Sequence, residues 1–286
     1  MKEQKKKKAG PPSRLGKWLA LLPAGCVFLY PLYLASQLQV AEKSYVHPAL
    51  PRPFDGLKIA YVSDIHWGSF LSDQRLEALI EQVNALEADF ILLGGDYAED
   101  ADGALAFWQR KPAFKAGIAT LAVFGNHDRT LPENHFPRIQ RAMKQSGVIP
   151  LVNDVWTLEK EGSTLSFSGI DDYYNGWPDL KKVARLSQKA DFSIFLPHTP
   201  DVLPDVYALS EKPFFQLALC GHTHGGQVAL FGWAPLSSSK LGSRYLSGWY
   251  REHGADILVS NGVGTSVLPV RLGARPQIHL ITLQCE

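Results

Sequence analysis

The chain has 286 residues, of which 45% are hydrophobic and 20% charged, a composition that supports one large core and excludes a disordered, collagen-like or coiled-coil protein. Its three cysteines are too few and too scattered for a disulfide scaffold or a cysteine zinc site. Residues 1–17 carry +6 of a net charge of +1, which leaves −5 for residues 18–286. Without a basic face the body is not expected to bind nucleic acid, and nothing in it indicates a protein partner.

The N-terminal segment predicts a membrane anchor. No charged residue occurs over residues 18–40, and residues 18–34 are nearly all apolar, enough to cross a hydrocarbon core about 30 Å thick. We expect a basic cytoplasmic tail over 1–17, a transmembrane anchor over 18–40, a linker over 41–56 and a catalytic domain over 57–286. The lysine-rich tail stays in the cytoplasm, so the domain is expected on the extracytoplasmic side of the cell membrane, held by a single pass. A cleaved signal peptide and a buried core helix are the alternatives.

From residue 57 onward, short apolar runs alternate with helical patterns. Residues 57–63 predict a buried strand, and Ser72 begins a helix whose apolar positions recur at helical spacing as far as Leu86. Further strands are expected at 90–93, 118–124, 164–170, 192–196, 215–220, 257–260 and 278–283, and helices near 137–145 and 177–186. This alternation predicts a layered α/β domain.

Side chains that bind metals follow these strands where they end. They are Asp64, His66, Asp96, Asn126, His198, His222 and His224. In an open α/β sheet the carboxyl ends of the strands share one rim, so groups distant in sequence can converge there. Buried carboxylates placed so close together repel each other unless cations lie among them. The sequence therefore predicts a metal centre.

The number of ligands indicates two divalent cations. Asp96 is expected to bridge them, with Asp64, His66 and His224 on one and Asn126, His198 and His222 on the other. Oxygen and imidazole ligands without thiolate suit Mn, Fe, Zn or Mg, and the spacing does not choose among these metals. Two ions about 3.5–4 Å apart hold phosphate oxygens and lower the pKa of a bridging water until it becomes an attacking hydroxide.

Two neighbours of Asn126 have expected catalytic roles. His127 is not needed as a ligand and is placed to protonate the leaving oxygen. Asp128 is placed to orient or charge-stabilise that step.

The sequence blocks that carry these residues resemble the five signature blocks of the calcineurin-like metallophosphoesterases over roughly residues 57–284. They are Asp64-Ile65-His66, Gly95-Asp96, Gly125-Asn126-His127-Asp128, His198 and Gly221-His222-Thr223-His224. The resemblance implies a four-layer αββα sandwich, a dinuclear centre with the ligands above, and hydrolysis of phosphomonoesters, phosphodiesters or pyrophosphates. Tyr97 follows Asp96 where protein phosphatases have Asp-Arg-Gly, and Asp128 stands where many relatives have Glu.

The substrate is less closely defined by the sequence. The apolar N-terminus together with these blocks is similar to the bacterial membrane-associated branch of the family, which implies a phosphodiester or pyrophosphate, including a lipid-linked one. That branch also includes UDP-2,3-diacylglucosamine hydrolases of lipid A synthesis, and this activity is the alternative. A non-catalytic metal-binding scaffold of the same fold is the alternative from another class. Arg129, Tyr97 and Arg244 are the expected substrate-binding residues, because they lie near the motif blocks or in late loops.

Overall fold

The computed structural model describes residues 29–286 except residues 69, 131–134 and 236. Two six-stranded sheets form its centre. In spatial order the first holds β1 (Gln39–Val46), β12 (Gln277–Gln284), β2 (Lys58–Val62), β3 (Phe90–Leu93), β4 (Ala119–Ala122) and β5 (Val148–Pro150). The second holds β10 (Gly248–Glu252), β11 (Ala255–Val259), β9 (Leu217–Cys220), β8 (Phe192–Leu196), β7 (Ser163–Gly169) and β6 (Asp154–Lys160).

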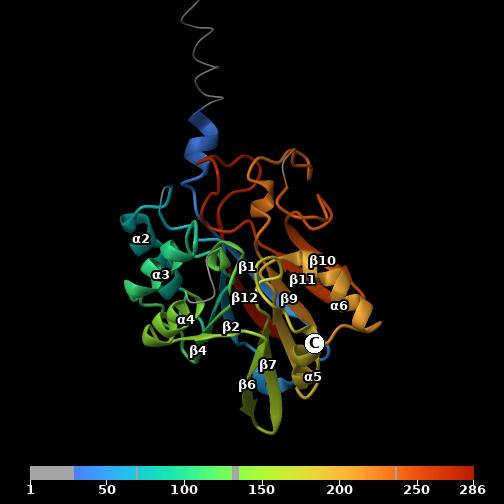
Figure 1. Cartoon of the computed structure of the whole chain (residues 1–286). Helices are drawn as coiled ribbons and strands as arrows, with labels where there is room; N and C mark the ends of the chain where they lie inside the picture. Colours follow the sequence, from blue (N-terminus) through green and yellow to red (C-terminus); the bar gives the residue numbers. More distant parts are fainter. Residues whose placement is uncertain (1–28, 69, 131–134, 236) are drawn as a thin grey trace, which may run out of the picture.

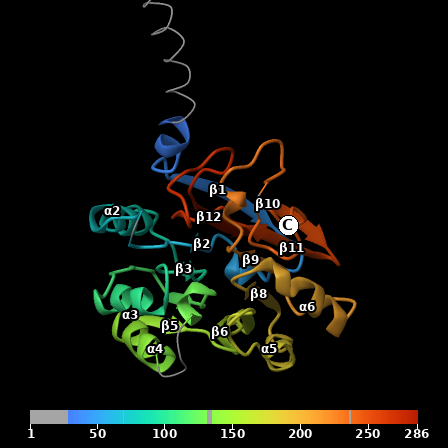
Figure 2. The ribbon, with the colours of Figure 1, turned by 45° about the horizontal axis from the view of Figure 1, so that its top comes forward.

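Helices cover the outer face of each sheet. Helices α2 (Asp73–Asn84), α3 (Ala101–Gln109) and α4 (Phe136–Gln145) lie beside the first sheet, and α5 (Leu180–Ser187) and α6 (Leu203–Leu209) beside the second (Figures 1 and 2). The short 3-10 turns are η1 (Arg52–Phe54), η2 (His127–Arg129), η3 (Pro200–Val202) and η4 (His224–Gly226).

Alternation of side chains along the strands builds the layers. In β2, Ile59 and Tyr61 point into the core between the sheets, where they meet residues such as Phe167. Ala60 and Val62, on the other face of β2, pack against the core under α2, α3 and α4. A third core joins the second sheet to α5 and α6. The predicted four-layer αββα sandwich is therefore confirmed.

The predicted α2 shows how local sequence sets an element. The Ser72 side chain accepts a hydrogen bond from the Arg75 backbone N–H and so caps the helix. Leu76, Leu79 and Val83 are buried at helical spacing. The predicted strands were found within a few residues of their expected bounds.

The N-terminal boundaries require correction. The predicted linker over 41–56 and the last residues of the predicted anchor contain β1, which pairs in parallel with β12 over eight residues. Residues 29–34 are helical, whereas residues 1–28, which hold most of the predicted tail and anchor, lie outside the described residues. Among the residues that are described, no helix is both long enough and apolar enough to span a bilayer.

Strand direction places the site. Strands β2, β3 and β4 run parallel in the first sheet, and β8 and β9 run parallel in the second. The loops after these strands carry the predicted ligands, so they meet along one rim of the sandwich.

Candidate metal centre

Most of the predicted ligands sit on strained backbone. Five of the seven have positive φ, from 45° to 68°, a region that residues other than glycine rarely adopt. They are Asp64, His66, Asp96, His222 and His224. Each such residue costs on the order of 1 kcal/mol, and strain of this kind collects at functional sites. These strained turns direct the side chains of the predicted ligands toward the candidate metal centre.

Asp64, His66 and His224 form the first ligand set. One potential ligand atom from each lies within 4.8 Å of the other two. The Nε2 atoms of His66 and His224 are 3.1 Å apart, and Asp64 Oδ1 lies 3.7 Å from His224 Nε2. All three residues are buried. The structure thus brings together the three residues predicted to hold one ion.

Asp96, His198 and His222 form the second set, with the same 4.8 Å limit between their ligand atoms. Asp96 Oδ2 lies 3.1 Å from His198 Nε2 and 3.6 Å from His66 Nε2. Asp96 therefore stands between the two sets, where the sequence predicted a bridging carboxylate. Asn126 lines the same pocket as Asp96 and His222.

The donor atoms fit divalent cations. Among the described residues, Asp64 Oδ2 and Asn126 Oδ1 are buried without a hydrogen-bond partner. A buried oxygen without a partner costs roughly 1–3 kcal/mol, and the facing imidazole nitrogens of His66 and His224 can share only one proton. A cation bound by these atoms removes the cost, so the residues present fit the predicted metals.

The electrostatics of the centre also favour cations. Burial favours neutral Asp96, but the positive charge of a protonated His198 and its hydrogen bond hold the Asp96 pKa well below its usual range. Burial likewise opposes protonation of His198, yet Asp96 raises its pKa to about 10. Burial, with the charges of His66 and Arg271, holds the pKa of His224 well below its ordinary value. A divalent cation held here would take the place of a proton on His198, while the lowered pKa of His224 favours the neutral imidazole that binds metals.

Backbone carbonyls orient the ligand imidazoles. His198 Nδ1 lies 2.8 Å from the Gly94 carbonyl, which fixes the tautomer whose Nε2 faces Asp96. His222 Nε2 lies 3.3 Å from the Ser238 carbonyl, so its Nδ1 keeps the lone pair. These carbonyls could not be predicted from residue types, because every residue has a backbone carbonyl.

Two glycines make room for the carboxylates. A Cβ at Gly125 would lie 2.1 Å from Asp96 Oδ1, and one at Gly221 would lie 2.4 Å from Asp64 Oδ2. No side chain can be accommodated at such distances without moving the ligand. Close approach of backbone to the centre is therefore the reason for glycine at these positions.

His127 lies at the edge of the centre. One of its ring nitrogens is within 4.8 Å of ligand atoms of His66 and Asp96. Its Nδ1 lies 2.7 Å from the Glu99 carbonyl, so Nδ1–H donates there and Nε2 stays free as the reactive nitrogen. The backbone N–H of His127 donates to Asp96 Oδ1 at 2.9 Å.

Asp128 does not have the predicted position beside the reacting groups. Its two carboxylate oxygens accept hydrogen bonds from the backbone N–H groups of Asp96, Tyr97 and Gly125, at 2.8, 3.0 and 2.8 Å. It is buried and joins the loop after β3 to the loop after β4. Asp128 therefore positions the predicted ligands Asp96 and Asn126, and the carbonyl of Glu99 takes the orienting role on His127.

Comparison with known proteins decides the family. Residues 57–226 match the family described as calcineurin-like phosphoesterase. The chain belongs to this family. The phosphoesterase is 30% identical over 271 residues to the metallophosphoesterase YkuE of Bacillus subtilis, with 92% of each chain covered. It is 29% identical over 234 residues to phosphodiesterase YaeI of Escherichia coli, with 79% of this chain and 82% of YaeI covered.

A dimetal phosphatase of Danio rerio is similar in structure, with a TM-score of 0.46 and 10% identity over 75% of this chain and 90% of that one. Membership of the family makes this protein a metal-dependent phosphoester hydrolase. The convergence of six of the seven predicted ligands argues against the non-catalytic scaffold.

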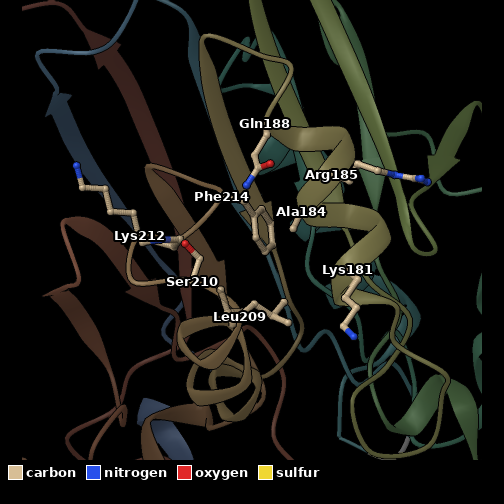
Figure 3. A pocket seen from close by; sticks show the side chains of 10 residues that line it. Lys181, Ala184, Arg185, Gln188, Leu209, Ser210, Lys212 and Phe214 are labelled. Atoms are coloured by element: carbon tan, nitrogen blue, oxygen red, sulfur yellow. The ribbon is translucent and has the colours of Figure 1, made fainter.

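A pocket of about 340 Å³ opens onto the metal centre of the phosphoesterase. Its lining includes the polar side chains of Asp96, Asn126, His127, His222 and His224. The same lining includes Gln227 and three serines, and the apolar residues Val228, Pro235, Val267, Leu268 and Val270. A second hollow of about 310 Å³ lies between α5 and the end of α6, and Figure 3 shows Arg185 and Lys212 on its rim pointing away from each other. None of the predicted site residues lines this second hollow.

The predicted substrate-binding residues of the phosphoesterase are engaged elsewhere. Tyr97 is fully buried and donates to the Val123 carbonyl at 2.6 Å. Arg129 pairs with Asp171 at 2.9 Å, and Arg244 pairs with Glu252 at 3.1 Å. None of the three lines the pocket at the metal centre. The apolar pocket residues were missed because their types match those of any core.

Proposed function

We propose that this phosphoesterase hydrolyses a phosphodiester or pyrophosphate whose phosphate is attached to an apolar group, such as a lipid. The mixed lining of the pocket at the metal centre carries this proposal. Asp96, Asn126 and His222 suit phosphate oxygens, while Val228 and Val267 in the same lining suit an acyl chain or another apolar moiety. YaeI, the relative named a phosphodiesterase, supports the diester class.

Two divalent ions, among Mn, Fe, Zn and Mg, would be held by the seven ligands, with Asp96 between them. When bound, the ions supply positive charge for the phosphate oxygens and lower the pKa of the attacking water. His127 lines the pocket, and its Nδ1 is taken by the Glu99 carbonyl. Protonated at Nε2, His127 delivers a proton to the leaving oxygen, and the leaving group departs as a neutral alcohol or as a less charged phosphate.

We also propose that residues 18–34 anchor the chain in the cell membrane with the catalytic domain on the extracytoplasmic side. The charge-free run over residues 18–40 and the lysines over residues 1–17 support this topology. A relative from Danio rerio, 28% identical over 286 residues with 93% of this chain and 62% of that protein covered, is named transmembrane protein with metallophosphoesterase domain.

The acid role of His127 is tested with two diesters that differ in leaving group. His127→Ala is expected to keep its metal content and to lose about 100-fold or more in kcat on a diester with an alkyl leaving group. The loss is expected to be much smaller on a p-nitrophenyl diester, because p-nitrophenolate leaves without a proton. Equal losses on both substrates would remove the acid role, and loss of metal would make His127 a ligand.

The substrate class is tested by comparing diesters with and without acyl chains, together with UDP-2,3-diacylglucosamine. A higher kcat/KM for the acylated diester supports the proposal. Preference for short soluble diesters would refute the lipid-linked part. Rapid cleavage of UDP-2,3-diacylglucosamine, with a reporter fusion that places the domain in the cytoplasm, would establish the alternative instead.

A further inference from the structure

Large exposed hydrophobic side chains gather at one end of the molecule. Nine of the fifteen in the described part of the chain lie in three short segments, namely the helix at 29–34, the loop at 230–233 and the loop at 267–268. These nine, here called the apolar end, are Leu29, Tyr30, Leu32, Tyr33, Leu230, Phe231, Trp233, Val267 and Leu268. Phe231 is fully exposed and Val267 is 83% exposed. Single exposed apolar residues are ordinary, but a set gathered in this way marks an interaction surface.

Hydrogen bonds hold the three segments together. The Arg271 backbone N–H donates to the Pro31 carbonyl at 2.9 Å, which ties the second loop to the helix. The Gln227 side chain donates to the Ser266 carbonyl at 2.8 Å and accepts from the Ser266 N–H at 2.7 Å, which ties the two loops to each other. Figures 1 and 2 show the helix, the orange loop and the red loop side by side at this end. The apolar end is therefore one surface.

The two loops present their apolar side chains on constrained backbone. Leu230 and Trp233 exchange hydrogen bonds at 2.9 and 3.0 Å, which closes a tight hairpin with Phe231 at its tip. Phe231 and Val267 have φ of 53° and 64°, which is unfavourable for an aromatic residue and more so for a β-branched one. A hairpin tip made of Asn and Gly would avoid this cost. Removal of these apolar side chains from water would offset this cost.

The sequence before residue 29 indicates what covers the apolar side chains of these loops. Residues 18–28 are apolar and lead directly into the helix at 29–34, which belongs to the apolar end. A membrane anchor in this stretch brings the lipid surface to that end of the domain and to no other. Tyr and Trp, present here as Tyr30, Tyr33 and Trp233, favour the boundary between headgroups and acyl chains.

We propose that the apolar end rests in a lipid bilayer, with the loops at 230–233 and 267–268 inserted among the headgroups. Val267 and Leu268 also line the pocket at the metal centre, so the mouth of the pocket opens against the lipid. A lipid-borne phosphate then reaches the centre by lateral movement, with its apolar part still in the bilayer. This proposal rests on the proposed lipid-linked substrate and adds how the domain is oriented to meet it.

The orientation is tested by depth-dependent quenching of tryptophan fluorescence. The full-length, metal-loaded protein is reconstituted in vesicles of phosphatidylethanolamine and phosphatidylglycerol that contain a phosphatidylcholine brominated near the headgroup. Trp233→Phe is expected to reduce the emission that the bromolipid quenches, by up to about one seventh of the total emission, because the chain has seven tryptophans. Trp177→Phe is the matched control, because Trp177 is 75% exposed and lies outside the apolar end. Equal quenching of the two variants would overturn the proposal.

Phe231→Asp separates this proposal from the proposed function. Phe231 does not line the pocket, and Asp tolerates the left-handed backbone, so activity on a soluble diester should be unchanged. Hydrolysis of a diester embedded in vesicles is expected to fall roughly tenfold. Unchanged activity in vesicles would overturn the proposed orientation but not the proposed hydrolytic function. The His127→Ala test on soluble diesters concerns only the proposed function. A dimer in detergent that Phe231→Asp dissociates would make the apolar end a protein interface and would also overturn the orientation.

Discussion

Replacing Gly125 by alanine tests whether the bridging position of Asp96 depends on the space beside it. The added Cβ would stand 2.1 Å from Asp96 Oδ1 and 2.7 Å from the Asp96 backbone N, whereas ordinary contact begins near 3.4 Å. The carboxylate must therefore retreat by about 1.3 Å, which is 3.4 less 2.1. That movement also breaks the 2.9 Å hydrogen bond from the His127 N–H to Asp96 Oδ1.

The magnitude follows from the bond lengths at such centres. Metal–oxygen bonds are about 2.0–2.2 Å long, so a carboxylate displaced by more than 1 Å no longer reaches both ions. A 1 Å misplacement costs on the order of 100-fold in rate, and overpacking costs about 1–3 kcal/mol of stability. We expect kcat to fall about 100-fold or more and bound metal to fall from two ions toward one.

The assay is kcat on a p-nitrophenyl diester, with metal content by elemental analysis and stability by thermal unfolding. Gly117→Ala is the control, because the nearest atom to its added Cβ, Asp89 Cα, is at 3.5 Å, an ordinary contact. The control is expected to keep both its metals and its rate. A Gly125→Ala protein with two ions and a rate within twofold of wild type would show that the position of Asp96 does not depend on this space.

Asp128, His279 and the predicted ions each allow a further test. Asp128→Asn presents an NH₂ group to backbone N–H donors now bound by carboxylate oxygens, so the free energy of unfolding should fall by roughly 2 kcal/mol or more, measured by urea titration; an unchanged value would contradict the bonds described. Burial lowers the pKa of His279 to about 4 from an unfolded value of 6.5, so between these pH values the unfolded chain binds a proton that the folded chain does not. The contribution to stability is therefore full above pH 6.5 and falls by about 3 kcal/mol as the pH drops to 4. Urea titrations at a series of pH values should show that His279→Gln has lost this part of the acid sensitivity. If the free metal concentration is about 100 times Kd, chelation of the divalent ions should lower the thermal midpoint by roughly 5–10 °C in scanning calorimetry. An unchanged midpoint would show that metal binding does not stabilise the folded chain.

The convergence of these side chains could be predicted because the end of a strand can be recognised in the sequence. Apolar runs such as 57–63 and 90–93 end at polar residues, and the rim of an α/β sheet brings such residues together. The positive φ at Asp64 and His222 could not be foreseen, since nothing in those residue types demands it. The backbone carbonyl of Glu99, which accepts from His127, could not be predicted either, because every residue type has one.

The missed elements lack the signals on which sequence interpretation depends. Strand β1 carries Glu42 and Lys43, and Tyr45 is its one buried side chain, because the strand lies at the edge of its sheet. Helix α3 contains Gly103, a poor helix former, and depends on Asp100, whose side chain accepts from the Gly103 N–H. The left-handed turn at Asp96 directs the Tyr97 side chain into the core, so its place beside a motif does not make it a substrate contact.

The pairing of β1 with β12 has a consequence for recombinant production of this enzyme. Residue 57, where the family match begins, comes after β1, so a chain cut there would leave one side of β12 with unpaired N–H and C=O groups along eight residues. Open strand borders of that length recruit strands from other molecules and lead to precipitates. A chain that starts at Gln39 or earlier keeps this border covered, and expression trials should be designed around that residue.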